Sequence, residues 1–147
     1  MEKLYQIKNP ADFLPVIKSI LKTVKQEKPL VITLTGELGS GKTTFTQELG
    51  GFLGVSEQIV SPTYTLMRQY PVEHDFYNKL VHIDAYRIES EDEINPLHLE
   101  SVFNRPKTII CIEWPEIISS IIPKEAINLS INITDGEQRE LRITSLD

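Results

Sequence analysis

The chain has 147 residues, of which 40% are hydrophobic and 24% are charged, and this length and balance predict one globular domain over residues 1–147. A single cysteine, Cys111, excludes an internal disulfide, and without a second cysteine there is no Cys-x-x-Cys pair for a structural zinc site. The formal net charge of −6 disfavours unaided binding to nucleic acid, because phosphate backbones attract basic surfaces.

The N-terminal segment predicts a short strand followed by a helix. Residues 1–6 carry charged and amide groups where a signal peptide needs an apolar stretch, and no apolar run approaches the ~20 residues that span a bilayer, so we expect a cytoplasmic protein without membrane contact. A strand is expected at residues 3–7, and Asn9 before Pro10 indicates the start of a helix. The apolar residues that recur at helical spacing are Phe13, Ile17, Ile20, Leu21 and Val24.

The next segment has the pattern of a buried strand, a glycine-rich loop and a helix. Residues 30–34 are a compact β-rich run, typical of a buried parallel strand. A helix is expected over residues 43–53, ending before Gly54, because glycine is common just after a helix. Further strands are expected at residues 64–70, 80–86, 108–113, 127–133 and 141–144, with a helical piece over 97–103.

This order of elements predicts the fold class. Strands that alternate with helices indicate an α/β fold with a largely parallel sheet flanked by helices. Asp135 followed by Gly136 is a hairpin signal between the last two strands. We therefore expect an antiparallel C-terminal hairpin at the edge of the sheet.

The loop between the first long strand and its helix carries the chemistry. Residues 36–43, GELGSGKT, match the phosphate-binding pattern G-x-x-x-x-G-K-[ST] in the strand-loop-helix context that it requires. Glycines let successive N–H groups face one point, and the helix N-terminus adds positive potential there. The fold is therefore predicted to be P-loop NTPase-like, with Lys42 on the β- and γ-phosphates and Thr43 on a magnesium ion. The predicted nucleotide-binding residues are Glu37, Leu38, Gly39, Ser40, Gly41, Lys42, Thr43 and Thr44.

Two acidic residues end two of the apolar strands. Period-2 alternation places His82 and Asp84 on one face of their strand, and Glu113 ends the apolar run 108–112. Ligands of open α/β sheets gather at the carboxyl ends of strands, so either acid is well placed to hold magnesium, and the choice between them stays open. The predicted catalytic residues are Lys42, Asp84 and Glu113, and the predicted metal site consists of Thr43, Glu113 and Asp84.

Two more positions are interpreted from their place in the chain. Thr63 lies in the proline-stiffened loop 61–65, where a switch loop would sense γ-phosphate and magnesium, although a plain loop leading into a strand has the same pattern. Trp114 directly follows Glu113 and is either a core anchor or a wall of the site.

Four segments in series resemble the bacterial TsaE family, also called YjeE. They are the P-loop 36–44, SPTYTL at 61–66, HIDAYR at 82–87 and EWP at 113–115. The resemblance covers the chain from about Leu30 to Pro115. It implies a small P-loop ATPase of the machinery that makes threonylcarbamoyladenosine on the adenosine beside the anticodon of tRNA. It also implies that Lys42 and Thr43 serve phosphate and magnesium, that Asp84 stands in a second acidic motif, and that Glu113 is a metal-site acid next to Trp114.

The same resemblance implies partners and cofactors. By this resemblance, the chain looks like the accessory subunit that binds the TsaB–TsaD heterodimer, hydrolyses ATP with magnesium there and permits repeated turnover. We therefore expect a magnesium-dependent ATPase that is weak alone and stimulated by TsaB–TsaD. Contact with tRNA would be made mainly through these partners, which agrees with the acidic net charge of the chain.

Two other functions are compatible with a P-loop. A small-molecule kinase uses the same loop but generally needs a basic lid, and the five arginines of this chain do not cluster. The second is a nucleotide-responsive binding module whose hydrolysis is incidental. ATP is the expected nucleotide, because the guanine motif Asn-Lys-x-Asp is absent: Asn78-Lys79 is followed by Leu80-Val81.

Overall fold

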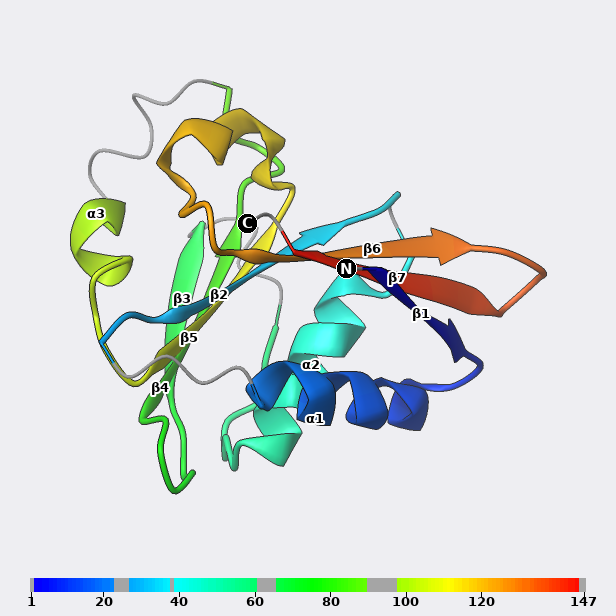
Figure 1. The fold of residues 1–147 in the computed structure, drawn as a ribbon, viewed down its shortest axis with the longest axis horizontal. Helices are drawn as coiled ribbons and strands as arrows, with labels where there is room; N and C mark the ends of the chain where they lie inside the picture. The colour runs from blue at the N-terminus through cyan, green and yellow to red at the C-terminus, as the bar shows by residue number, and fades with distance from the viewer. Residues whose placement is uncertain (1, 23–26, 38, 61–65, 90–97, 146–147) are drawn as a thin grey trace.

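A computed structural model describes residues 2–22, 27–37, 39–60, 66–89 and 98–145 of the chain (Figure 1). Its strands are β1 (Glu2–Ile7), β2 (Leu30–Thr35), β3 (Met67–Pro71), β4 (Lys79–Asp84), β5 (Thr108–Glu113), β6 (Ile127–Ile133) and β7 (Arg139–Ser145). Its helices are η1 (Pro10–Phe13), α1 (Leu14–Leu21), α2 (Lys42–Phe52), α3 (Leu99–Val102) and η4 (Pro115–Ile121). The predicted α/β fold is confirmed.

The strands form one sheet in the order β1-β7-β6-β2-β5-β4-β3. Its central strands, β6, β2, β5 and β4, are parallel, whereas β3 pairs antiparallel with β4 at one edge. The predicted C-terminal hairpin is formed by β6 and β7, which are antiparallel, and its turn is closed by the Gln138 N–H donating to the Asp135 carbonyl at 2.9 Å. The hairpin was expected at the edge of the sheet, but β1 pairs antiparallel with β7 and forms the outermost strand, so the hairpin lies one strand inside that edge.

Alternation along the central strands gives the sheet two apolar faces. On one face, Ile32 and Leu34 of β2 pack with side chains of α1 and α2, such as Phe45. On the other face, Val31 of β2 packs in a second cluster with side chains of α3 and η4, such as Val102. Both faces of the central strands are therefore covered, as a parallel sheet requires. Among the described residues, no helix combines the length and apolar character needed to cross a membrane.

Several element boundaries differ from the sequence expectation. The N-terminal helix begins with the 3-10 turn η1, whose N-cap Asn9 accepts a hydrogen bond from the Ala11 N–H at 3.1 Å. The α-helical part starts only at Leu14 and has a proline, Pro15, in its first turn, where the missing N–H of proline costs no helical hydrogen bond. Of the expected strand 64–70 the structure describes β3, and of the expected helix 97–103 it describes α3; residues 64, 65 and 97, and Val24 of the predicted helix, lie outside the described residues.

Candidate functional site

The glycine-rich loop joins the end of β2 to the start of α2, as predicted. Gly36 follows β2 with φ +148°, and Gly41 is the N-cap of α2 with φ +114°, values in the left-handed region that favours glycine. The first helical hydrogen bond runs from the Phe45 N–H to the Gly41 carbonyl at 2.9 Å. The N–H groups of the first helical turn have no partner within a helix, so this turn can donate to an anion.

The loop is supported from outside by the C-terminal hairpin. A Cβ atom on Gly36 would clash with the backbone oxygen of Ile131 in β6 and would lie 2.7 Å from Ser40 Oγ. Arg139, the first residue of β7, donates from Nε to the Ser40 carbonyl at 3.1 Å and from Nη2 to the Gly39 carbonyl at 3.3 Å. The loop therefore rests on β6 and is tied to β7.

Lys42 lies under the loop with its ammonium group turned to the loop backbone. Its Nζ donates to the Gly36 carbonyl at 2.6 Å and to the Glu37 carbonyl at 3.0 Å, and lies 4.1 Å from the centroid of the Trp114 ring. The side chain is buried, and burial lowers the pKa of Lys42, against the opposing effect of the negative charges of Glu113 and other nearby acids.

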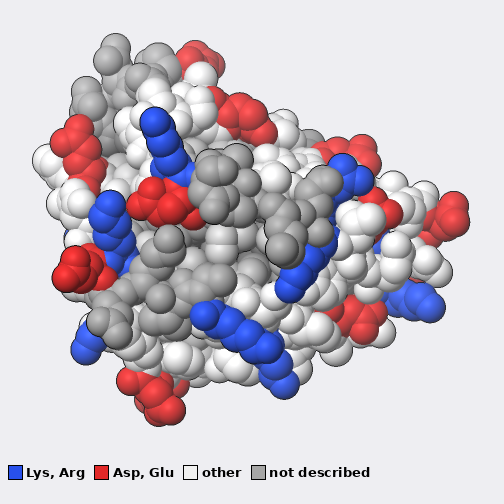
Figure 2. Space-filling view, in the orientation of Figure 1, with Lys and Arg blue, Asp and Glu red and all other residues white. Residues whose placement is uncertain are grey.

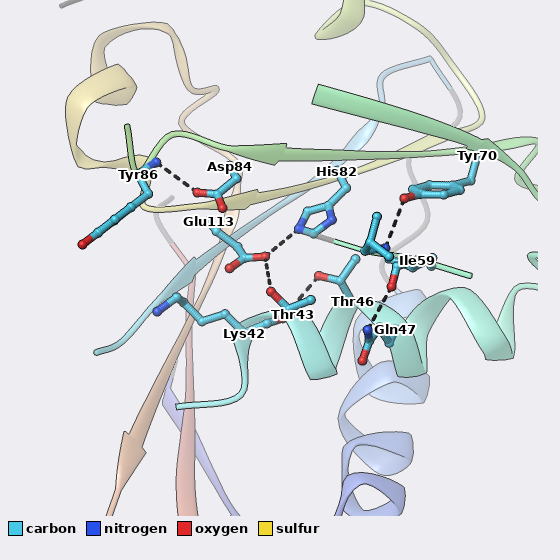
Figure 3. Close-up of polar contacts among 11 residues, drawn as sticks. Lys42, Thr43, Thr46, Gln47, Ile59, Tyr70, His82, Asp84, Tyr86 and Glu113 are labelled. Carbon is cyan, nitrogen blue, oxygen red and sulfur yellow. Dashed lines mark hydrogen bonds and ion pairs between the residues drawn. The ribbon is translucent and has the colours of Figure 1, made fainter. Parts of the chain in front are cut away.

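The hydroxyl of the next residue, Thr43, contacts the acid that ends β5. Thr43 Oγ1 donates to Glu113 Oε2 at 2.9 Å, and His82 Nε2 lies 2.6 Å from the same oxygen. Figure 3 shows the three side chains converging from α2, β5 and β4. Thr43 thus contacts Glu113, while the sequence had left open which of the two acids, Asp84 or Glu113, would hold magnesium directly.

Asp84 and Trp114 stand on the same side of the loop. Asp84 pairs in register with Glu113 across β4 and β5, and its Oδ1 accepts the Tyr86 N–H at 3.0 Å. Trp114 has a left-handed backbone, φ +55°, which is uncommon for a bulky residue. Its ring lies 5.1 Å from that of Tyr86. Trp114 packs against the second core cluster and also lines the cavity in front of the loop, so it has features of both predicted roles.

These side chains enclose a cavity of about 350 Å³ in front of the loop. The described residues contain no group of three or more His, Cys, Asp and Glu side chains that could hold a metal ion. The cavity is lined by Gly39, Gly41, Lys42, Thr43, Thr44, Asp84, Tyr86, Arg87, Glu113 and Trp114.

A second cavity of about 310 Å³ adjoins the first. The two share Gly39, Gly41 and Thr44 of the loop and helix α2. The other residues that line the second cavity are Ile7, Lys8, Asn9, Pro10, Phe13, Ser40, Glu137 and Arg139. One cavity therefore lies on the β5 side of the loop and the other on its β7 side.

The structure brings most of the predicted residues together. Lys42, Thr43, Asp84, Glu113 and Trp114 line one cavity. Glu37 contributes its backbone carbonyl, and Gly39, Ser40, Gly41 and Thr44 line one or both cavities. Leu38 and Thr63 lie outside the described residues, so their predicted roles stay predictions.

Sequence reasoning missed two residues of this site. His82 was placed on the face of Asp84 by alternation, which was the available signal, but its bond to Glu113 depends on the alignment of β4 with β5. Arg139 carries no local signal, because it reaches the loop from the far end of the chain.

Comparison with known proteins shows the family of the chain. The family model described as "Threonylcarbamoyl adenosine biosynthesis protein TsaE" matches residues 7–141. The chain is 34% identical to the tRNA threonylcarbamoyladenosine biosynthesis protein TsaE of Bacillus subtilis over 116 residues, which cover 79% of this chain and 70% of that protein. It is 34% identical to the protein of the same name from Rickettsia bellii over 129 residues, which cover 87% and 85% of the two chains.

A solved structure shares the fold. The crystal structure of Bacillus subtilis YdiB superposes with a TM-score of 0.75 and 25% sequence identity, covering 100% of this chain and 87% of that one. The match to the family model spans most of the chain and includes the loop, Asp84 and Glu113. With the sequence relatives, these findings establish that the chain belongs to the TsaE family.

Proposed function

We propose that this chain binds and hydrolyses ATP with magnesium as an accessory subunit of tRNA threonylcarbamoyladenosine synthesis. The observation that carries the proposal is the Thr43–Glu113 hydrogen bond at the floor of the loop cavity. In P-loop NTPases the loop serine or threonine and an acidic residue from a neighbouring strand together hold the magnesium ion. The names of the relatives from Bacillus subtilis and Rickettsia bellii include this modification, and because the chain belongs to their family, we assign it the same pathway in this proposal.

The loop and Lys42 would bind the phosphates. The ammonium group carries three donors, two of which meet the carbonyls of Gly36 and Glu37, and phosphate oxygens would compete with these carbonyls. Because burial lowers the pKa of Lys42, a phosphate at this site also supplies the negative charge that favours the protonated lysine.

The residues beside the loop fit a magnesium ion bound together with phosphates. Magnesium prefers oxygen ligands and is usually bound through one or two carboxylates with substrate phosphates; Thr43, Glu113 and Asp84 supply a hydroxyl and two carboxylates. Thr43 donates its hydrogen to Glu113, which leaves the hydroxyl oxygen able to act as a ligand. When bound, the ion would neutralise negative charge on the β- and γ-phosphate oxygens.

The second cavity would hold the nucleoside. With the γ-phosphate beside Glu113, a nucleotide that runs along the loop extends past Thr44 toward Asn9 and Pro10, which line that space. Phe13 adds an aromatic side chain to the same wall, and apolar and aromatic surfaces suit a base. The missing guanine motif supports ATP as the nucleotide.

The charge distribution supports contact with tRNA mainly through the TsaB–TsaD heterodimer. The net charge is −6, and on the face drawn in Figure 2 basic and acidic side chains of the described residues are interspersed without a continuous basic stretch. The face drawn there offers little of the counterion release that drives binding to phosphate backbones.

The test is phosphate release from ATP by the purified chain, alone and with TsaB–TsaD from the same organism. We expect weak release alone, stronger release with the partners, and loss of both in Lys42→Ala. Equal rates with and without TsaB–TsaD would contradict the accessory role. Full activity of Lys42→Ala would remove the loop from the mechanism, and transfer of phosphate to a metabolite would favour a small-molecule kinase.

A further inference from the structure

His82 is a fully buried polar residue in the middle of β4. Alternation places it on the face of the sheet covered by α2, between Leu80 and Asp84 on the same strand. Its Nε2 lies 2.6 Å from Glu113 Oε2. We assign the hydrogen of this bond to the imidazole Nε2, because an ionised carboxylate only accepts hydrogen bonds.

The same Glu113 oxygen accepts the hydroxyl of Thr43 at 2.9 Å. Two donors from different elements, β4 and α2, thus hold one oxygen of the carboxylate. Figure 3 shows the second oxygen of Glu113 turned away from His82, toward the side where Lys42 and Asp84 lie. The pair of hydrogen bonds therefore sets the direction in which the second oxygen points.

Packing alone does not account for an imidazole at this position. His82 Nδ1 is buried and has no hydrogen-bond partner among the described residues, and an unpaired buried polar atom is unfavourable relative to an apolar one. Leu80 and Cys111, its neighbours on the strand and across to β5, belong to the apolar core. The polar contact that His82 makes in the described structure is the one to Glu113.

We propose that His82 is a positioning residue for ATP hydrolysis, which holds Glu113 with its second carboxylate oxygen facing the phosphate cavity. The inference rests on the proposed ATPase function. His82 acts on hydrolysis by orienting Glu113. It does not contact the nucleotide, since it is not among the residues that line the cavity. Loss of the His82–Glu113 bond should therefore slow hydrolysis and leave ATP affinity little changed.

The first test compares two replacements of similar length. His82→Met removes the donor, and His82→Gln retains an N–H at a similar distance from the backbone. With TsaB–TsaD present, we expect His82→Met to lower kcat roughly 10–100-fold, the range seen when an outer partner of a metal-site residue is removed. ATP affinity, measured by calorimetry, should stay close to that of the wild type, and His82→Gln should recover most of kcat. Equal loss in both variants would overturn the inference.

The second test asks whether His82 acts through Glu113. In a Glu113→Gln background, His82→Met should cause no further loss of kcat, whereas independent roles would give additive losses and overturn the inference. If the wild-type chain hydrolyses ATP and His82→Met has the same kcat, this inference is overturned while the proposed function stands. A wild-type chain that does not hydrolyse ATP would overturn the proposed function and this inference with it.

A third readout needs no activity. The chain has three histidines, so their imidazole ¹⁵N resonances can be separated in the full chain. The Nε2 resonance of His82 should carry a slowly exchanging hydrogen and should shift in Glu113→Gln, while those of His74 and His98 stay in place. An unshifted His82 resonance would show that the contact with Glu113 is not formed in solution.

Discussion

Replacing Gly36 with alanine tests how tightly the glycine-rich loop rests on the sheet. Its backbone has φ +148°, and a Cβ atom there would clash with the Ile131 carbonyl and lie 2.7 Å from Ser40 Oγ. A left-handed backbone costs an L-residue about 1–2 kcal/mol, and relief of the clash by shifting β6 or the loop costs about 1–3 kcal/mol more. We therefore expect a loss of about 2–5 kcal/mol in the free energy of unfolding, or roughly 4–20 °C in Tm.

Gly39→Ala is the matched control for this experiment. Gly39 also has a left-handed backbone, φ +79°, but a Cβ atom there would meet nothing within 4 Å. Only the backbone cost of about 1–2 kcal/mol applies, so calorimetric unfolding should give a clearly smaller loss of Tm than in Gly36→Ala. Equal losses in the two variants would refute the conclusion that β6 supports the loop.

Three further predictions follow from the site and the core. Glu113→Ala should lower the rate of ATP hydrolysis far more than ATP affinity, as measured by phosphate release and calorimetry; a variant with full activity would leave Asp84 as the main metal-site acid. Arg139→Met removes the bonds to the loop carbonyls and should weaken ATP binding roughly fivefold, or about 1 kcal/mol; unchanged affinity would mean that the loop keeps its shape without the arginine. Burial raises the pKa of Cys111 to about 12, so at pH 8 the thiol is protonated and a thiol reagent should label the native chain slowly and the urea-unfolded chain quickly; rapid labelling of the native chain would contradict this burial.

The strand, glycine-rich loop and helix could be predicted because their determinants are adjacent in the sequence. Strand, glycines, lysine and helix lie within residues 30–53, and each acts on the local backbone. Asp84 and Glu113 could be assigned to one edge of the sheet, since both end parallel strands. The sequence did not reveal that Thr43 contacts Glu113, because this follows from strand order: β5 is the direct neighbour of β2, whereas β4 is one strand further out.

Contacts between distant parts of the chain could not be predicted, because they too depend on which elements become neighbours in the folded sheet. Arg139 bonds to Ser40 across 99 positions, and no periodicity or spacing indicates which loop an isolated arginine will reach. The pairing of β1 with β7 joins the two ends of the described chain and likewise has no local signature. The split of the first helix at Leu14 is set by capping at Asn9 and by Pro15, a detail finer than hydrophobic spacing.

The support of the loop by β6 and β7 has a consequence for the folding of the chain during synthesis. Gly36 packs on Ile131, and Ser40 is held by Arg139, so the loop emerges from the ribosome long before the strands on which it rests. Contacts of such long sequence separation form late, because the intervening chain must first be ordered. A nascent chain that ends before β6 carries the complete GELGSGKT motif without the backing that fixes its shape, and nucleotide binding during translation should begin only once the C-terminal hairpin has paired.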